Sequence, residues 1–105
     1  MSEGLDRLFA TIAARKDADP GQSYTAKLLA AGVEKCARKF EEEATETVIA
    51  AIQQDKTELA KESADVLYHL AVLWAASGIT PEDVYAVLRA RETMSGLEEK
   101  AGRKS

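Results

Sequence analysis

The sequence predicts an all-α fold of about five helices around a central antiparallel helical hairpin. The chain of 105 residues contains only two Pro and six Gly, the residues that most often interrupt a helix. Its apolar residues recur at helical spacing and do not alternate as they would in a strand. We expect one domain over residues 1–94, followed by a flexible polar tail over residues 95–105.

The first two helices are separated by a strong turn signal. A first helix over residues 3–16 is predicted because Leu5, Leu8 and Ile12 fall on one face. The segment Asp19-Pro20-Gly21 then breaks the helical pattern. A short second helix is expected to begin after Ser23, a residue typical of helix N-caps, and to end at Gly32.

Two long helices follow, and each has clear boundaries. The chain has no breaker between Val33 and about Gln54, which predicts a helix of that length. Asp55 is a typical cap for a further helix over residues 56–77. Because so short a turn joins these helices, we expect them to form the antiparallel hairpin. Thr80 and Pro81 signal the start of a last helix, which fades after Arg91.

Composition excludes several classes of function. The net charge is −4 and no basic stripe is present, so a nucleic-acid partner is not expected. No run approaches 18 apolar residues, so no membrane span is predicted. The single Cys36 cannot form an internal disulfide and is predicted to be a buried thiol, and the N-terminal residues lack the apolar segment of a signal peptide. We therefore expect a cytoplasmic protein.

The segment KFEEEATET, residues 39–47, concentrates four acidic side chains on the first long helix. At about 100° per residue, Glu42, Glu43 and Glu46 converge on one side, whereas Glu41 points away from them. The apolar side of this helix, with Glu43 at its border, is predicted to consist of Phe40, Ala44, Thr47, Val48 and Ala51.

The second long helix repeats the arrangement in KESADVLYHL. Glu58, Glu62, Asp65 and His69 lie along the edge of a stripe predicted to be core, which contains Val66, Leu67, Leu70 and Trp74. An antiparallel hairpin would bring the two acidic edges together. One interpretation is a set of solvated charges that flank the core. The recurrence of acids on both edges favours the other, a site for a hard divalent cation such as Mg²⁺.

The acidic motifs and the segments around them are similar to those of a known family. Glu43-x-x-Glu46 followed by Glu62-x-x-Asp65 resembles the signature of the MazG-type all-α NTP pyrophosphatases. Between about Leu5 and Arg91, three segments resemble the successive motifs of the phosphoribosyl-ATP pyrophosphohydrolase family: SYTAKLLAAG (23–32), the residues around Glu41 in KFEEEATET, and ESADVLYHLAVL (62–73). The family usually has a small residue in place of Glu41, which puts local packing or a subunit contact in doubt.

The resemblance implies Mg²⁺-dependent hydrolysis of phosphoribosyl-ATP to phosphoribosyl-AMP and pyrophosphate, the second step of histidine synthesis. The metal ligands would be Glu43, Glu46, Glu62 and Asp65. Glu42, Glu43 and Glu46 are the expected catalytic carboxylates. For Glu42, two roles stay open, because it could bind a second ion or orient the attacking water.

Substrate contacts are expected from both sides of this site. Lys39 lies on the same side of the helix as Glu42 and could meet a phosphate oxygen as a point charge. Lys27 and Lys35 are weaker candidates for the same role. Ser23, Tyr24 and Thr25 match a family segment that could form the pocket or cap the short helix, and His69 could contact substrate or pack beside Tyr68.

The apolar edges of the hairpin predict a homodimer in which two hairpins pair into a bundle, and the resemblance implies the same. Two other functions stay open. A MazG-type enzyme acting on free or non-canonical nucleotides would share the acidic site. A non-catalytic helical dimerisation module would show neither turnover nor stabilisation by Mg²⁺.

Overall fold

The computed structural model describes residues 3–92 as five α-helices with no strand among them, which confirms the predicted all-α class. The helices are α1 (Glu3–Ala14), α2 (Tyr24–Ala31), α3 (Val33–Ile52), α4 (Lys56–Ser77) and α5 (Pro81–Arg91). The first helix ends two residues before the predicted Lys16. The predicted tail over residues 95–105 lies outside the described residues.

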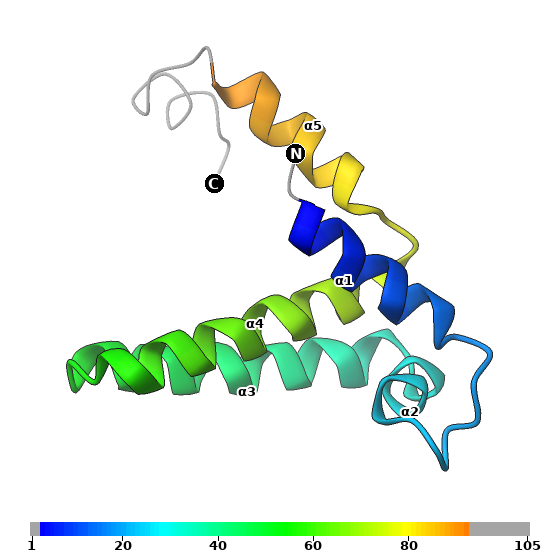
Figure 1. Cartoon of the computed structure of the whole chain (residues 1–105), viewed down its shortest axis with the longest axis horizontal. Coiled ribbons are helices and arrows are strands. Elements are labelled where there is room, and N and C mark those ends of the chain that lie inside the picture. The colour runs from blue at the N-terminus through cyan, green and yellow to red at the C-terminus, as the bar shows by residue number, and fades with distance from the viewer. Residues whose placement is uncertain (1–2, 93–105) are drawn as a thin grey trace.

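The two long helices form the predicted antiparallel hairpin, which spans the width of the molecule (Figure 1). Asp55 caps α4, and its carboxylate accepts a hydrogen bond of 3.0 Å from the backbone N–H of Glu58. Gln54 adopts a left-handed conformation in the turn, with φ of 57°. This tight turn fixes α3 beside α4 along most of their lengths, so side chains on the facing sides must share one interface.

The buried core lies where four of the helices meet. It consists of Ile12 from α1, Leu28 from α2, Cys36 from α3, and Ala71 and Val72 from α4. The thiol of Cys36 donates a hydrogen bond of 3.3 Å to the carbonyl oxygen of Leu28, which ties the start of α3 to α2. As predicted, Cys36 is buried. The core therefore holds α1 and α2 against one end of the hairpin and leaves the turn end uncovered (Figure 1).

Helix α5 begins as the sequence predicts and packs mainly on α1. Thr80 and Asp83 form a reciprocal capping box, and Pro81 occupies the first turn. The hydroxyl of Tyr85 donates a hydrogen bond of 3.0 Å to the carboxylate of Asp6 on α1. Helix α5 therefore supports α1, and it leaves the opposite side of the hairpin free.

The packed side of α3 differs from the predicted one by about a quarter turn. Cys36, Glu43 and Ala50 face the rest of the protein, whereas Val48 is 56% exposed and Ala51 is also exposed. The prediction was wrong because long apolar side chains alone do not identify the packed side. Small side chains such as Ala50 let α3 approach α4 closely. As a result Glu43 lies within the interface, not at its border.

On α4, the prediction of a core stripe was correct for Trp74, which is 8% exposed, and wrong for Leu67, which is about half exposed. Of the two long helices, only α4 also packs closely against α1. The buried residues of α4 therefore lie on two of its sides. This second contact buries Ala71 and Val72, which the stripe did not include. Among residues 3–92, no helix is both long and apolar enough to cross a membrane.

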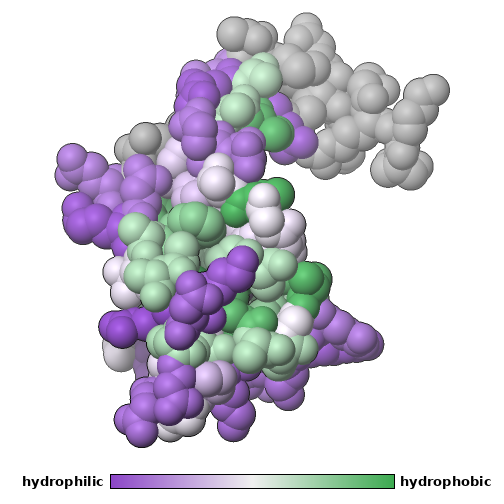
Figure 2. All heavy atoms as spheres, turned by 90° about the vertical axis from the view of Figure 1, so that its right-hand side faces the viewer, coloured by the Kyte–Doolittle hydropathy of each residue, from purple (hydrophilic) through white to green (hydrophobic). Residues whose placement is uncertain are grey.

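The end of the molecule that carries α2 has apolar surface surrounded by hydrophilic side chains (Figure 2). Between α1, α2 and the end of α4, a pocket of about 330 Å³ opens beside Phe9, Leu29 and Ile79. Gly78 follows α4 in the left-handed conformation, with φ of 79°, and turns the chain toward α5 there.

Removal of the Ile12 side chain tests the position of the core. Because Ile12 is 1% exposed, Ile12→Ala is expected to lower the free energy of unfolding by about 2–5 kcal/mol. The matched control is Ile79→Ala, at an exposed position, which should cost much less. Urea titrations followed by circular dichroism measure both values, and equal losses would contradict the assignment of the core.

Candidate active site

Three carboxylates from the two long helices meet at the centre of the hairpin. Glu43 on α3 and Glu62 and Asp65 on α4 each offer an oxygen, and these oxygens lie within 4.8 Å of one another. Glu62 and Asp65 are three residues apart, so both point to one side of α4. All three side chains are partly buried. The hairpin thus brings together acids that are nineteen and more residues apart in the chain.

Glu46 joins this group one turn further along α3. Its negative charge acts on both Glu43 and Glu62 and raises the pKa of each. Glu46 itself is more exposed than the other three. We call Glu43, Glu46, Glu62 and Asp65 the carboxylate cluster. It contains the four residues for which a ligand role was predicted.

Crowding in the carboxylate cluster makes ionisation unfavourable. Burial raises the pKa of Glu43 to about 7, and the hydrogen bond and charge of Glu46 add to the effect. The negative charges of Asp65 and Glu62 act in the same direction. The pKa of Glu62 is also raised, first by burial and then by the charges of Glu46 and Asp65. The cluster therefore takes up positive charge readily, as protons or as a cation.

The donor set of the cluster fits a hard divalent cation. Every potential ligand atom is a carboxylate oxygen, the type that Mg²⁺ and Ca²⁺ prefer. In addition, Oε2 of Glu62 is buried and has no hydrogen-bond partner within the described part of the chain. A buried carboxylate oxygen normally has a partner, so this atom is consistent with a ligand that the protein does not itself supply.

Glu42 lies beside the cluster and pairs with Lys39. The ammonium group of Lys39 donates a hydrogen bond of 3.3 Å to Oε1 of Glu42. This bond is the main cause of a raised pKa of Lys39, so the ammonium group keeps its charge. Glu42 does not join the three oxygens that converge, and its side chain is exposed. Glu41 is also outside the cluster, and it pairs with Arg38 on the outer side of α3.

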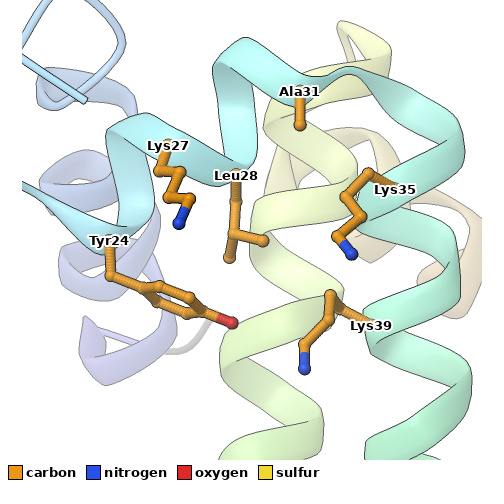
Figure 3. A pocket seen from close by; sticks show the side chains of 6 residues that line it. All are labelled: Tyr24, Lys27, Leu28, Ala31, Lys35 and Lys39. Atoms are coloured by element: carbon orange, nitrogen blue, oxygen red, sulfur yellow. The ribbon is translucent and has the colours of Figure 1, made fainter. Parts of the chain in front are cut away.

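A pocket with three lysines adjoins the site. It has a volume of about 250 Å³ and lies between α2 and α3, where it is lined by Tyr24, Lys27, Leu28, Ala31, Lys35 and Lys39 (Figure 3). Because Lys39 lines this pocket and also bonds to Glu42, it links the pocket to the acidic region. We call this cavity the lysine pocket. It contains all three lysines that the sequence suggested for phosphate binding.

Gly32 sets the angle between the two walls of the lysine pocket. It ends α2 and precedes α3 with φ of 98° and ψ of 174°, a conformation that residues with a side chain rarely adopt. The side chain of Ser23 caps the other end of α2 by accepting a hydrogen bond of 3.1 Å from the N–H of Ala26. For Ser23 the capping role is thus present, and a contact with substrate stays a prediction.

Aromatic side chains hold α2 on α4 behind the pocket. His69 is buried and contacts the rings of Tyr24 and Tyr68 edge-on, at centroid distances of 6.3 and 4.9 Å. Burial lowers the pKa of His69, and the nearby charge of Lys39 contributes. Thr25 and Tyr68 share a hydrogen bond between their hydroxyl groups. His69 therefore packs beside Tyr68, one of its two predicted roles, and a contact with substrate remains untested.

The sequence did not single out Leu28 and Ala31, which line the pocket, and it indicated Tyr68 only as a packing neighbour of His69. The first two share a face with Tyr24 and Lys27, since the four positions follow the three- and four-residue spacing of a helix. That spacing could have shown the common face. It could not have shown which neighbour the face meets, because the turn at Gly32 decides the direction of α2. For Tyr68, nothing in the local sequence indicates the bond to Thr25.

The protonation of Glu43 predicts an unusual dependence of stability on pH. Its pKa is about 7 in the folded chain and 4.5 as the ordinary value, so the folded state holds a proton that the unfolded state releases. In buffer that contains a metal chelator, the Glu43 carboxyl should lower the free energy of unfolding as the pH rises from about 4.5 to about 7. Glu43→Gln should lack this part of the decline. Thermal unfolding between pH 4.5 and 8 measures it, with Glu41→Gln as control, and parallel profiles for all three proteins would contradict the prediction.

Comparison with known proteins identifies the family. The profile of the phosphoribosyl-ATP pyrophosphohydrolase family matches residues 5–92. A protein of Parvibaculum lavamentivorans named phosphoribosyl-ATP pyrophosphatase is 64% identical over 94% of this chain and 91% of its own length. Proteins of the same name from Cereibacter sphaeroides and Azospirillum brasilense are 61% and 57% identical, over 94% and 96% of this chain and 96% and 91% of their own lengths. The chain therefore belongs to the phosphoribosyl-ATP pyrophosphohydrolase family.

Proposed function

We propose that this protein is an enzyme that hydrolyses phosphoribosyl-ATP to phosphoribosyl-AMP and pyrophosphate, the second step of histidine synthesis. The observation that carries the proposal is the carboxylate cluster at the centre of the hairpin, next to a pocket with three lysines. The names of relatives about 60% identical over almost the whole chain support the same activity. As a step of amino-acid synthesis, the reaction would take place in the cytoplasm.

The cofactor in this proposal is a divalent cation, and specifically Mg²⁺. Glu43, Glu46, Glu62 and Asp65 would hold it. The oxygens of Glu43, Glu62 and Asp65 converge, the charge of Glu46 acts on Glu43 and Glu62, and one buried oxygen of Glu62 lacks a partner within the described residues. When bound, such an ion supplies positive charge against the phosphoanhydride and acidifies water. The carboxylates themselves fix the position of the charge. Their mutual repulsion disfavours the metal-free ionised state and so adds to the affinity.

Two charged residues beside the cluster would handle the reacting groups. Lys39 keeps its proton and would meet a phosphate oxygen as a point charge. Glu42 accepts the hydrogen bond of Lys39 and has an exposed carboxylate. Substrate that draws Lys39 away would release this carboxylate to orient the attacking water or to bind a second ion.

The lysine pocket would bind the rest of the substrate. Lys27 and Lys35 contribute positive charge, and Tyr24 contributes an aromatic wall. Ser23 and Thr25 would hold α2, which carries this wall, in position. Ser23 caps α2, and Thr25 bonds to Tyr68 on α4. His69 supports the ring of Tyr24 edge-on. These residues orient the substrate and leave its phosphates at the carboxylate cluster.

Removal of one carboxylate charge tests the proposed activity. Glu46→Gln keeps the shape of the side chain and removes the charge, so Mg²⁺-dependent release of pyrophosphate from phosphoribosyl-ATP should fall by at least about tenfold. Glu41→Gln is the matched control, because it removes a charge from the same helix outside the cluster. Circular dichroism should show unchanged helix content in both variants.

Other outcomes of this experiment would identify another function. Turnover of ordinary nucleoside triphosphates without turnover of phosphoribosyl-ATP would indicate a MazG-type enzyme that acts on free nucleotides. No turnover of either substrate, together with no stabilisation by Mg²⁺, would overturn the enzymatic proposal. The protein would then be a helical module with an acidic groove.

We also propose that the protein forms a homodimer through the outer side of the hairpin. Val48, Ile49 and Ile52 are exposed on the part of α3 that α1, α2 and α5 leave uncovered, and Ile52 is 75% exposed. Ile49 also lines a pocket of about 250 Å³ together with Glu46 and Glu62. A second hairpin on this side would bury the apolar residues and exclude water from one edge of the carboxylate cluster.

A charge on the outer side of α3 tests the dimer. Ile52→Asp should convert a dimer into a monomer in light scattering coupled to size exclusion, because a buried unpaired carboxylate opposes association. Thr11→Asp, at an exposed position of α1, should leave the mass unchanged. A monomeric wild type, or a dimeric Ile52→Asp variant, would contradict this interface.

A further inference from the structure

The lysine pocket contains positive charges that are not paired with an acidic residue of the site. Lys39 is paired with Glu42, whereas Lys27 and Lys35 form no ion pair within residues 3–92. Both side chains are exposed at the pocket and come from different helices, α2 and α3 (Figure 3). Two ammonium groups of this kind attract an anion, and no acidic residue lines the pocket.

The helical register separates these two lysines from the carboxylates. Lys35, Lys39 and Glu43 follow one another at four-residue steps along α3, so each step advances about 6 Å. Lys39, the paired lysine, is therefore next to the cluster, and Lys35 is about 12 Å from Glu43 along the axis. An anion held by Lys27 and Lys35 lies at the far end of the pocket from the carboxylates. It is a different group from the phosphates at the cluster.

The remaining walls of the pocket suit a sugar or a base attached to that anion. Leu28 and Ala31 form apolar walls, and the ring of Tyr24 borders the cavity (Figure 3). Because Tyr24 rests against His69, the ring is held in place and offers a ready surface for stacking. A site for inorganic phosphate alone would need no such walls. The pocket therefore matches a phosphorylated organic group.

The proposed substrate has two anionic ends, and only one of them is hydrolysed. Its triphosphate requires the carboxylate cluster, and the phosphate of its phosphoribosyl group requires positive charge elsewhere. ATP has only the first of these ends. A subsite for the second end would distinguish phosphoribosyl-ATP from the much simpler nucleotide.

We infer that the lysine pocket is the subsite for the phosphate of the phosphoribosyl group, with Lys27 and Lys35 as its specificity-determining residues. This inference rests on the proposed function and assigns one part of the substrate to one part of the site. Lys39 stands between the two ends and serves the triphosphate. Selection against ATP thus arises from charge about two helical turns away from the reacting bond.

The test compares the binding of phosphoribosyl-AMP and AMP in the presence of Mg²⁺, because neither compound has the phosphoanhydride bond that the enzyme would hydrolyse. Wild type is expected to bind phosphoribosyl-AMP at least about tenfold more tightly than AMP by calorimetric titration. Lys27→Met and Lys35→Met, separately and together, should reduce this ratio toward one and leave the affinity for AMP unchanged. Lys56→Met, at an exposed position on α4 outside the pocket, is the control and should keep the ratio.

Three results would overturn the inference. The first is a wild type with equal affinity for phosphoribosyl-AMP and AMP. The second is a double variant that keeps the wild-type ratio, and the third is a variant that loses affinity for AMP and phosphoribosyl-AMP equally, which would assign the lysines to the adenosine phosphate. Turnover of phosphoribosyl-ATP by wild type is measured in parallel. Its absence would refute the proposed function, whereas its presence with any of the three results would refute only the subsite.

Discussion

The close approach of α3 and α4 at Glu43 is the constraint on which the rest of the structure depends. Small side chains such as Ala50 allow the two helices to meet, and the same contact forces carboxylates from both helices together. In water these charges would separate, because their repulsion is unfavourable and burial adds to it. The core around Ile12 and Val72 supplies the stability that keeps them in place. The proposed function therefore depends on a local arrangement that the remainder of the fold must stabilise.

Helix α2 has a separate role from the hairpin. It contributes little length to the fold, yet it forms one wall of the lysine pocket and part of the core. Its position depends on Gly32 at one end, on Ser23 at the other, and on the contacts of Tyr24 and Thr25 with α4. The site is thus divided between a rigid acidic half on the hairpin and a basic half that α2 completes. In the proposed function, each half would bind a differently reacting anionic end of the substrate.

Most of the fold was accessible from sequence because its signals are local. Thr80 and Asp55 mark helix starts through hydrogen bonds with residues three positions away, and Pro81 marks one through its fixed backbone angle; these starts agree with the structure. The sequence also predicted that the acids of the carboxylate cluster lie along the edge of the packed side on each of the two long helices. The packed side of α3 was not accessible, since Val48 and Ala50 both lie on plausible faces and only the partner helix decides between them. The lysine pocket likewise depends on the direction that Gly32 gives to α2, a property of the backbone that no spacing of side chains encodes.

The buried thiol of Cys36, which bonds to Leu28, also provides a way to measure how often the pocket opens. Burial raises the pKa of the thiol, so in the closed protein it is both hidden and poorly nucleophilic. A thiol reagent can reach it only in molecules in which the packing around it has opened, and these include molecules in which α2 has lifted from α3. The rate of modification in excess reagent then counts these openings, and a ligand that bridges both walls of the pocket would slow it. The thiol of Cys36 thus reports how often the packing at the basic half of the site opens.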